Sequence, residues 1–450
     1  MAEEKSVILC AALMHGLGNQ GGAWRVRAGE ASDYVSPHFY ADLVRKAEDA
    51  KLHAIFLAEQ MVATADTIGE RPWGTVDVVA VLSFMAGLTS KIGLVGTGTT
   101  TYNQPYDLAR RFASLDHLAN GRAGWNSVTS AHANTAEQFG TAAHMQATER
   151  YDRADEFIDV VAALWASWES DALVGDKKNA VFADTTKIHQ INHQGPNFAV
   201  RGPLPFPKSR QGRPVIFHAG SSPQGRDQAS RVADVVFTAQ HTVQGAKEFR
   251  DDIRSRAAAY GRDPEKIKVF PGVNAVIGRT LAEAEDKKAA LDNAETIDQR
   301  LRFLSFRTGV PPETLRDYLD KPFPMDKLPP DDQLKGGTGW RKSTLDAANM
   351  ETGMTVRELM ARAPTPHHHI VGTADVVADA MMERIEAGAA DGFTMMIDVL
   401  PEGMNDIAQL LVPELRRRGV FHEDYEHNTL RGLLGVGEPQ PIVPFTAKEK

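Results

Sequence analysis

The sequence predicts an α/β protein built as a (β/α)8, or TIM, barrel with long insertions. Short apolar runs rich in β-forming residues alternate with amphipathic helical patterns, and this alternation is typical of a parallel sheet. The runs number eight, as the strands of such a barrel do. They cover residues 6–13, 53–59, 92–100, 123–130, 214–220, 234–239, 269–278 and 393–399.

Two long segments interrupt this alternation, residues 169–213 and 279–391. The first is rich in Gly, Pro and His, and the second combines charged helical stretches with a Pro/Gly-rich segment. Insertions between a strand and its helix lie over the active face of a barrel, so we expect both to form lids or pocket walls over the carboxyl-terminal face. The barrel and its insertions are expected to form one domain over residues 1–435, followed by an extended tail over 436–450.

Two amphipathic helices are predicted with particular clarity. In the first, Ser36 is placed to cap the helix and Pro37 occupies its first position, which tolerates proline. The second is expected from Glu149 to Trp168, with most of its aromatic residues in the core. The apolar face of the first helix is formed by Phe39, Leu43, Val44 and Ala47.

Composition excludes several classes of protein. No apolar run reaches the roughly 18 residues of a membrane helix, and the acidic start of the chain does not resemble a signal peptide. The single cysteine, Cys10, cannot form an internal disulfide and fits a reducing compartment, so we expect a cytoplasmic protein. A net charge of −9 argues against binding to nucleic acid or to an anionic membrane surface. A small-molecule ligand is therefore expected.

A turn suited to phosphate follows the fifth candidate strand. PVIFHAG leads directly into Ser221, Ser222, Pro223 and Gly225, and a helical pattern follows. Free amides at a helix N-terminus, together with two hydroxyl groups, are suited to a phosphate dianion. The alternative is that Ser222 is only a helix cap. The turn by itself leaves both interpretations open.

The end of the third candidate strand is rich in Gly and Thr. Glycine allows a flat ring to approach the backbone closely, and Thr97 and Thr101 offer hydroxyl groups for hydrogen bonds. Both threonines are equally well explained as ordinary strand residues.

The run TTTYNQPYDLARRFASLDHLANGRAGWNSVTS resembles a signature of the bacterial luciferase-like flavin-dependent monooxygenases, in the branch that contains nitrilotriacetate and dibenzothiophene sulfone monooxygenases. The similarity continues through residues 21–25, 149–169, 187–225 and 411–435, with the motifs in family order. It therefore covers nearly the whole chain and is far more specific than a single short motif.

This resemblance implies a TIM barrel with FMN across the carboxyl-terminal ends of its strands. Carried over to matching positions, it assigns Glu59, Thr97 or Thr101, Tyr151 and the Ser221–Ser222 pair to flavin binding. Two positions depart from the family pattern and bear on flavin affinity. Glu59 stands where aspartate is more usual, and Ala147 stands where similar members often carry a histidine, a contact that His144 could supply.

The resemblance also implies an activity. The family uses reduced FMN (FMNH2) and O2, through a C4a-(hydro)peroxyflavin, to oxygenate small organic molecules such as aminopolycarboxylates, organosulfur compounds or hydrocarbons. The resemblance also implies that a separate NAD(P)H:FMN reductase supplies the reduced flavin. A homodimer or homotetramer is also expected. The alternatives are a deazaflavin-dependent dehydrogenase of the same fold and a flavin-binding protein without turnover.

Histidines are the candidates for proton transfer because their ordinary pKa lies near neutrality. His132 follows the fourth candidate strand and is the predicted catalytic residue, although it could equally be a loop histidine bonded to the backbone. His367, His368 and His369 are consecutive, so their side chains diverge and are poorly placed to chelate one ion. No metal site is expected.

Five residues are predicted to shape a substrate pocket because they lie near strand ends or in the insertions. Most aromatic residues of a protein belong to its core, so only one or two of the five are expected to touch substrate. They are Trp24, Phe56, Trp125, His189 and Trp340.

Overall fold

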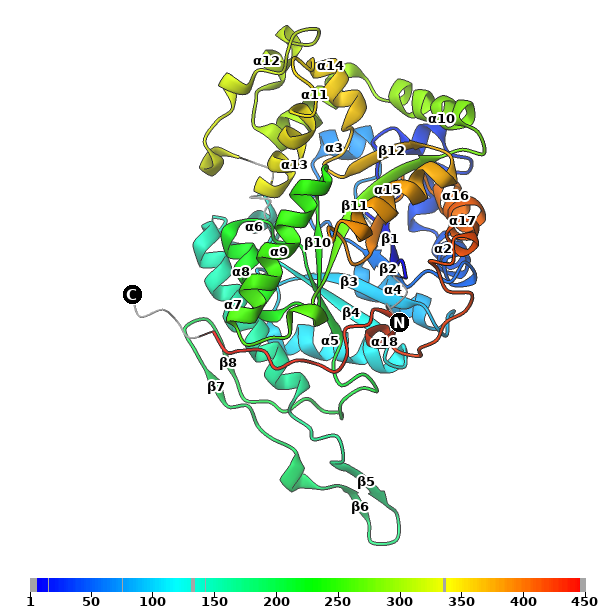
Figure 1. Cartoon of the computed structure of the whole chain (residues 1–450). Coiled ribbons are helices and arrows are strands. Elements are labelled where there is room, and N and C mark those ends of the chain that lie inside the picture. The colour runs from blue at the N-terminus through cyan, green and yellow to red at the C-terminus, as the bar shows by residue number, and fades with distance from the viewer. Residues whose placement is uncertain are drawn as a thin grey trace.

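The computed structural model describes residues 6–14, 16–74, 76–130, 134–141, 143–334 and 337–445. Its centre is a closed barrel of eight parallel strands (Figure 1), in which the pairing of β10 with β11 completes the ring. The strands are β1 (Leu9–Leu13), β2 (Ala54–Leu57), β3 (Gly93–Thr99), β4 (Ala123–Val128), β9 (Val215–His218), β10 (Val235–Thr238), β11 (Lys268–Ile277) and β13 (Phe393–Met396). The predicted fold class and all eight predicted strands are confirmed.

The central sheet contains one further strand, β12 (His368–Gly372), which was not predicted. It pairs in parallel with the second half of β11, from Val273 opposite His368 to Ile277 opposite Gly372. The first half of β11 pairs with β10. Because β12 begins with two histidines, it lacks the apolar run by which the other strands were predicted.

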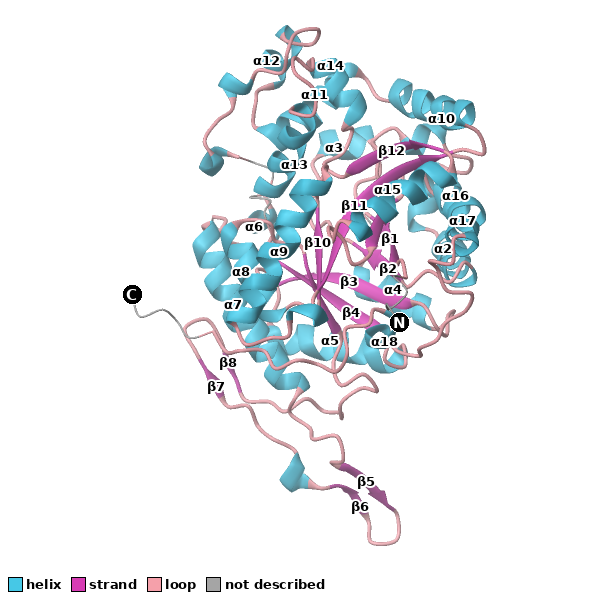
Figure 2. Ribbon diagram, in the orientation of Figure 1, coloured by secondary structure: helices cyan, strands magenta, loops and turns pink. Residues whose placement is uncertain are grey.

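Helices surround the barrel (Figure 2). The outer layer contains α2 (Pro37–Asp49), α4 (Val78–Ala86), α5 (Pro105–Leu118), α7 (Ala147–Trp165), α8 (Pro223–Val232), α9 (Val243–Ala259), α15 (Ala374–Glu386) and α17 (Val412–Arg417). The predicted apolar face of α2 is buried, and Pro37 is its first residue, but the Ser36 side chain makes no capping hydrogen bond. Helix α7 begins and ends slightly earlier than predicted, and Trp168 follows it.

Aromatic residues pack on both the outer and the inner face of the barrel. Trp125 of β4 is fully buried against the outer helices, where its Nε1 donates to the Gly98 carbonyl at 2.9 Å and its ring meets Trp165 edge-on at 5.8 Å. Phe56 of β2 lies inside the barrel, 6.1 Å from Phe217 and 5.8 Å from Phe237 between ring centres. Trp125 and Phe56 are therefore buried among core residues in this structure, and their place in a substrate pocket stays a prediction.

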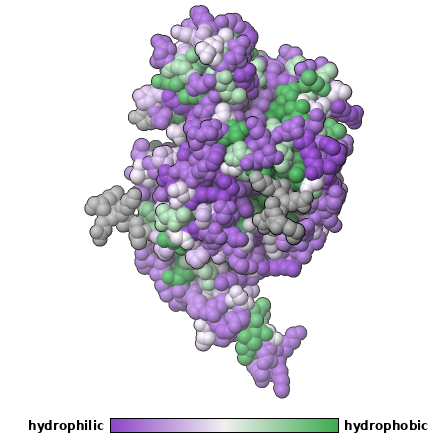
Figure 3. All heavy atoms as spheres, in the orientation of Figure 1, coloured by the Kyte–Doolittle hydropathy of each residue, from purple (hydrophilic) through white to green (hydrophobic). Residues whose placement is uncertain are grey.

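The first insertion carries two small hairpins, β5 (Leu173–Asp176) with β6 (Val181–Ala183), and β7 (His193–Gln194) with β8 (Ala199–Val200). It connects the end of α7 to the start of β9, so it belongs to the amino-terminal end of the barrel. The β5–β6 hairpin projects away from the body (Figure 1) and exposes Leu173, Val174 and Phe182 (Figure 3). The prediction that this insertion covers the carboxyl-terminal face is wrong, because it follows a helix and not a strand.

The second insertion follows β11 and lies at the opposite end of the barrel, as predicted. Four of its helices pack around a small core of their own: α11 (Ile297–Thr308), α12 (Pro312–Asp317), α13 (Thr338–Ala348) and α14 (Val356–Arg362). The helix that precedes them, α10 (Leu281–Ala294), packs against the barrel, where Leu291 meets Val276 of β11.

The described part of the C-terminal tail is extended, and hydrogen bonds attach it to the barrel. Phe445 N donates to Asp159 of α7 at 2.7 Å, and Arg231 of α8 donates to the Val443 carbonyl at 2.6 Å. Among the described residues, no helix combines the length and the apolar character that crossing a membrane requires.

A buried cluster of charged side chains lies at the amino-terminal end of the barrel. Asp234, which precedes β10, accepts hydrogen bonds from Arg213 at 3.1 Å, from Arg431 at 3.1 Å and from Ile216 N at 2.9 Å. Burial by itself would raise the pKa of Asp234, but Arg213 and Arg431 hold it well below its usual range. The cluster joins the strands to the segment near the C-terminus.

We expect Asp234→Asn to lower the free energy of unfolding by about 3–5 kcal/mol, because two buried guanidinium groups lose their counter-charge. The effect should be present above about pH 4 and should shrink as the pH falls, because Asp234 of the unfolded wild-type chain then takes up a proton that folding must remove. Urea unfolding measures it. Asp320→Asn, in the exposed pair with Arg357, is the control and should change little. Equal effects of the two substitutions would contradict the structural role of Asp234.

Candidate active site

The predicted phosphate turn lies between β9 and α8. Ser222 is the N-cap of α8, and its Oγ accepts a hydrogen bond from Gly225 N at 3.0 Å. The same Oγ donates to the Tyr151 hydroxyl of α7 at 3.2 Å. Ser222 is therefore a helix cap, and the same turn joins it to Tyr151, the other residue that the family resemblance assigned to phosphate binding. Phosphate binding at this turn stays a prediction.

Glycine is required on both sides of this turn. A Cβ on Gly225 would lie 2.8 Å from the Gly220 Cα and 2.9 Å from the Tyr151 hydroxyl, so both positions need the bare backbone. Ser221 is approached by the second insertion, since a Cβ on Gly339 of α13 would lie 2.4 Å from the Ser221 Cβ. The turn therefore lies between the barrel and α13. Its glycines leave room beside the backbone, and its hydroxyl groups can donate hydrogen bonds to a phosphate.

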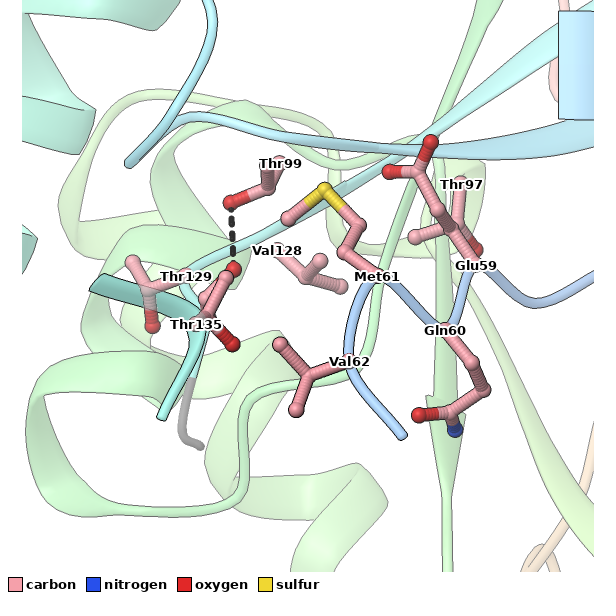
Figure 4. A pocket seen from close by; sticks show the side chains of 10 residues that line it. Glu59, Gln60, Met61, Val62, Thr97, Thr99, Val128, Thr129 and Thr135 are labelled. Atoms are coloured by element: carbon pink, nitrogen blue, oxygen red, sulfur yellow. Dashed lines mark hydrogen bonds between the residues drawn. The ribbon is translucent and has the colours of Figure 1, made fainter. Parts of the chain in front are cut away.

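A small cavity of about 130 Å³ lies at the carboxyl-terminal ends of β2, β3 and β4 (Figure 4). Glu59 and Thr97 both line it, as predicted. The Thr97 hydroxyl donates to the Leu57 carbonyl at 3.0 Å and accepts from Asn126 Nδ2 at 3.0 Å, so the strand ends hold it in one orientation.

The third-strand contact is better placed at Thr97 than at Thr101. Thr101 is buried outside the cavity, where its hydroxyl accepts a hydrogen bond from Ser130 N at 3.3 Å. Thr99 and Ser130 line the cavity and share a hydrogen bond of 2.9 Å. Sequence reasoning missed both residues, although alternation along β3 places Thr99 on the same face as Thr97.

Glu59 is the most perturbed acid of this cavity. Burial raises its pKa to about 7, the neighbouring Asp77 adds to the rise, and Arg111 opposes it. Its Oε2 atom is buried and has no hydrogen-bond partner among the described residues. A carboxyl group in this state can hold or release a proton near neutral pH, and its free oxygen can accept a hydrogen bond from a ligand.

A larger cavity of about 760 Å³ adjoins the first, since Gln60 and Val62 line both. Its remaining walls come from the second insertion and from the loops after β1 and β2. Its aromatic lining residues are Trp73, Phe303, Phe306 and Trp340, and its charged ones are Glu70, Arg71, Glu295 and Arg302. Its size and its mixed walls suit a small organic molecule.

Of the predicted pocket residues, Trp340 alone lines this cavity, where its ring meets Phe306 edge-on at 6.1 Å. Trp24 lies outside it with 36% of its surface exposed, and its Nε1 donates to the Glu70 carbonyl. His189 lies on the first insertion, where its Nε2 is 2.7 Å from Glu169, and it lines neither cavity. Trp24 and His189 therefore lie outside both cavities, and their assignment to a substrate pocket stays a prediction.

The predicted catalytic residue, His132, lies outside the described residues, and its role stays a prediction. His144 is hydrogen-bonded through Nδ1 to the Tyr102 hydroxyl at 2.7 Å and lines neither cavity. Ala147 is the first residue of α7.

The three consecutive histidines lie at the start of β12. Burial lowers the pKa of each, to about 3 for His367 and His369 and about 2 for His368, so all three are neutral at physiological pH. Within the described part of the chain, no group of three or more His, Cys, Asp or Glu side chains is arranged to hold a metal ion.

Comparison with known proteins decides the family. The model of the luciferase-like monooxygenases matches residues 21–391. The chain belongs to this family. It is therefore a monooxygenase, an enzyme of the oxidoreductase class, and the resemblance inferred from its motifs is confirmed.

Members of the luciferase-like family match the chain over nearly its full length. Nitrilotriacetate monooxygenase component A of Aminobacter aminovorans is 41% identical over 94% of this chain and 95% of that protein. Dibenzothiophene-sulfone monooxygenase of Rhodococcus erythropolis is 35% identical over 93% of this chain and 94% of that protein. A riboflavin lyase solved with modified FMN and riboflavin superposes with a TM-score of 0.82 at 31% identity, over 97% of each chain.

We expect Glu59→Gln to change how the stability of the ligand-free protein depends on pH. Glutamate in the unfolded chain titrates near pH 4.3, whereas burial raises the folded pKa to about 7. The folded state therefore keeps a proton that the unfolded state has lost, and wild-type stability should fall as the pH rises from about 4.5 to 7. Glutamine removes this penalty, so the variant should gain up to about 3 kcal/mol on wild type between pH 5 and 8.

Urea unfolding at a series of pH values measures this difference. Glu386→Gln, at an exposed position at the end of α15, is the control and should keep the wild-type pH profile. Parallel profiles for wild type and Glu59→Gln would show that Glu59 does not titrate near neutrality.

Proposed function

We propose that this enzyme is the oxygenase component of a two-component system that uses FMNH2 and O2 to oxygenate a small organic substrate. The observation that carries the proposal is the arrangement of the phosphate turn and the two cavities. All three lie at the carboxyl-terminal end of the barrel, partly under the second insertion. Barrel enzymes bind their ligands at this end.

The residues present fit FMN. Ser221, Ser222 and Tyr151 would hold its phosphate, and Glu59 and Thr97 would face its ring. When bound, the reduced flavin supplies the electrons that activate O2. Glu59 would accept a hydrogen bond from the ring or hold a proton beside it, and aromatic residues of the insertion, such as Trp340, would keep water from the reacting atoms.

A separate NAD(P)H:FMN reductase is proposed as the partner that delivers the reduced flavin. One observation supports it: its relative from Aminobacter aminovorans is named as one component of its enzyme. We also propose that the chain assembles as a homodimer or homotetramer, for which the apolar surface of the β5–β6 hairpin is a candidate contact.

The phosphate assignment predicts that Ser222→Ala and Tyr151→Phe weaken binding of FMN and leave binding of riboflavin unchanged. A hydrogen bond to a charged group contributes about 1.5–3 kcal/mol, so FMN affinity should fall roughly 10-fold to 100-fold. Riboflavin lacks the phosphate and serves as the internal reference. Anaerobic titrations of both reduced flavins, followed by fluorescence, measure the effect.

Thr242→Ala is the matched control for this experiment, because Thr242 caps the neighbouring helix α9 through Gly245 N in the same way. It should lower stability as Ser222→Ala does and leave FMN affinity intact. Equal losses of FMN and riboflavin affinity in Ser222→Ala would place the phosphate elsewhere.

The reaction itself is tested by supplying FMNH2 with 18O2 and a panel of organic substrates, and by following products by mass spectrometry. Incorporation of one labelled oxygen atom supports the proposal. Tight flavin binding without any oxygenated product would favour a flavin-binding protein, and turnover only with a reduced deazaflavin would favour the dehydrogenase alternative.

A further inference from the structure

We propose that the large cavity binds an organic carboxylate, with Arg71 as the residue that anchors the acid group. This inference rests on the proposed function, because it names the class of substrate that the oxygenase takes. Its starting point is a positively charged side chain in the cavity wall that forms no ion pair within 4 Å with any of the described residues.

Arg71 follows α3 (Ala65–Glu70) and lines the large cavity. Its guanidinium carbon lies 4.7 Å from the centre of the Trp73 ring, so the ring supports one face of the group. A guanidinium that stacks on an aromatic ring keeps its N–H donors at its edge, where they can bind a carboxylate through two parallel hydrogen bonds.

No carboxylate of the described residues lies within 4 Å of the Arg71 nitrogens, and its side chain makes no hydrogen bond to them. The second arginine of the cavity differs in this respect, since Arg302 is paired with Glu70. Burial lowers the pKa of Arg71, and Glu295 and Glu70 act in the opposite direction. A partly desolvated cation without an ion pair is costly, and an anionic ligand would remove that cost.

Glu295 is the nearest competitor for Arg71. A Cβ placed on Gly21 would lie 2.1 Å from Glu295 Oε1 and 3.5 Å from Arg71 Nη1, so the two groups face the same space without forming an ion pair. Burial raises the pKa of Glu295, and Arg71 and Arg300 oppose the rise. An acid bound at Arg71 would therefore meet repulsion from Glu295 only to the extent that Glu295 is ionised.

The rest of the wall limits the ligand further. Phe303, Phe306 and Trp340 give the cavity a large aromatic surface, so the bound acid should also carry an apolar part. An unsubstituted hydrocarbon would leave the Arg71 charge desolvated and unpaired. Through Gln60 and Val62 the cavity adjoins the one that we assign to the flavin ring, so an acid held at Arg71 could direct its other end toward that ring.

The test compares acids with their neutral methyl esters on the FMN-bound protein by isothermal titration calorimetry. The probes are nitrilotriacetate, thiodiacetate and 3-phenylpropanoate, each with its full methyl ester. We expect at least one acid to bind at least tenfold more tightly than its ester. Arg71→Gln should remove that preference, Arg71→Lys should restore part of it, and Glu295→Gln should preserve or increase it.

Arg300→Gln is the matched control, because Arg300 carries the same charge near Glu295 but does not line the cavity. It should keep the preference for the acid. Three outcomes would each overturn the proposal. The esters could bind as well as every acid, Arg71→Gln could keep the preference for the acid, or no acid could bind.

A failure of the proposed function can be distinguished from a failure of the Arg71 proposal. Flavin titration of wild type and Arg71→Gln should give the same FMN affinity, since Arg71 lies outside the phosphate turn and the small cavity. If wild type bound no flavin, the flavin assignment would fail, while the comparison of acids and esters on the flavin-free protein would still decide the role of Arg71.

Discussion

The arrangement of the carboxyl-terminal end of the barrel, where the two cavities lie, depends on the ten-residue strand β11. Its first half pairs with β10 and closes the barrel, and its second half extends beyond that ring and pairs with β12. These two pairings anchor both ends of the second insertion beside the strand ends where the cavities lie. A shorter β11 would still close the barrel, but it would leave the insertion without the strand pair that positions it over the site.

Buried charges in this enzyme fall into two groups. Asp234 is surrounded by two arginines and a backbone amide, and its full set of partners identifies it as part of the scaffold. Glu59 Oε2 is buried and has no hydrogen-bond partner among the described residues, and the half-buried Arg71 forms no ion pair with them. A protein bears the cost of such groups where a ligand completes them, and this contrast supports the proposed roles of Glu59 and Arg71.

Local patterns were enough to predict the eight strands and the serine-capped turn before α8, because apolar runs and a serine cap before a helix depend on neighbouring residues. The pocket walls depend on which side of a strand faces which layer. Trp125 and Phe56 lie on barrel strands and both proved to be core, whereas Trp340 reaches the cavity through the packing of α11 and α13. The position of the first insertion could have been predicted, because its place after a helix assigns it to the amino-terminal end.

The pairing of β1 with β13 has a consequence for synthesis on the ribosome. The first strand finds one of its two neighbours only when residues 393–396 have emerged, and α7 and α8 receive their contacts with the tail later still. Until then β1 presents an unpaired edge, which is a template for association with other chains. The nascent barrel must therefore remain open for most of translation, and we expect it to need protection by chaperones during that time.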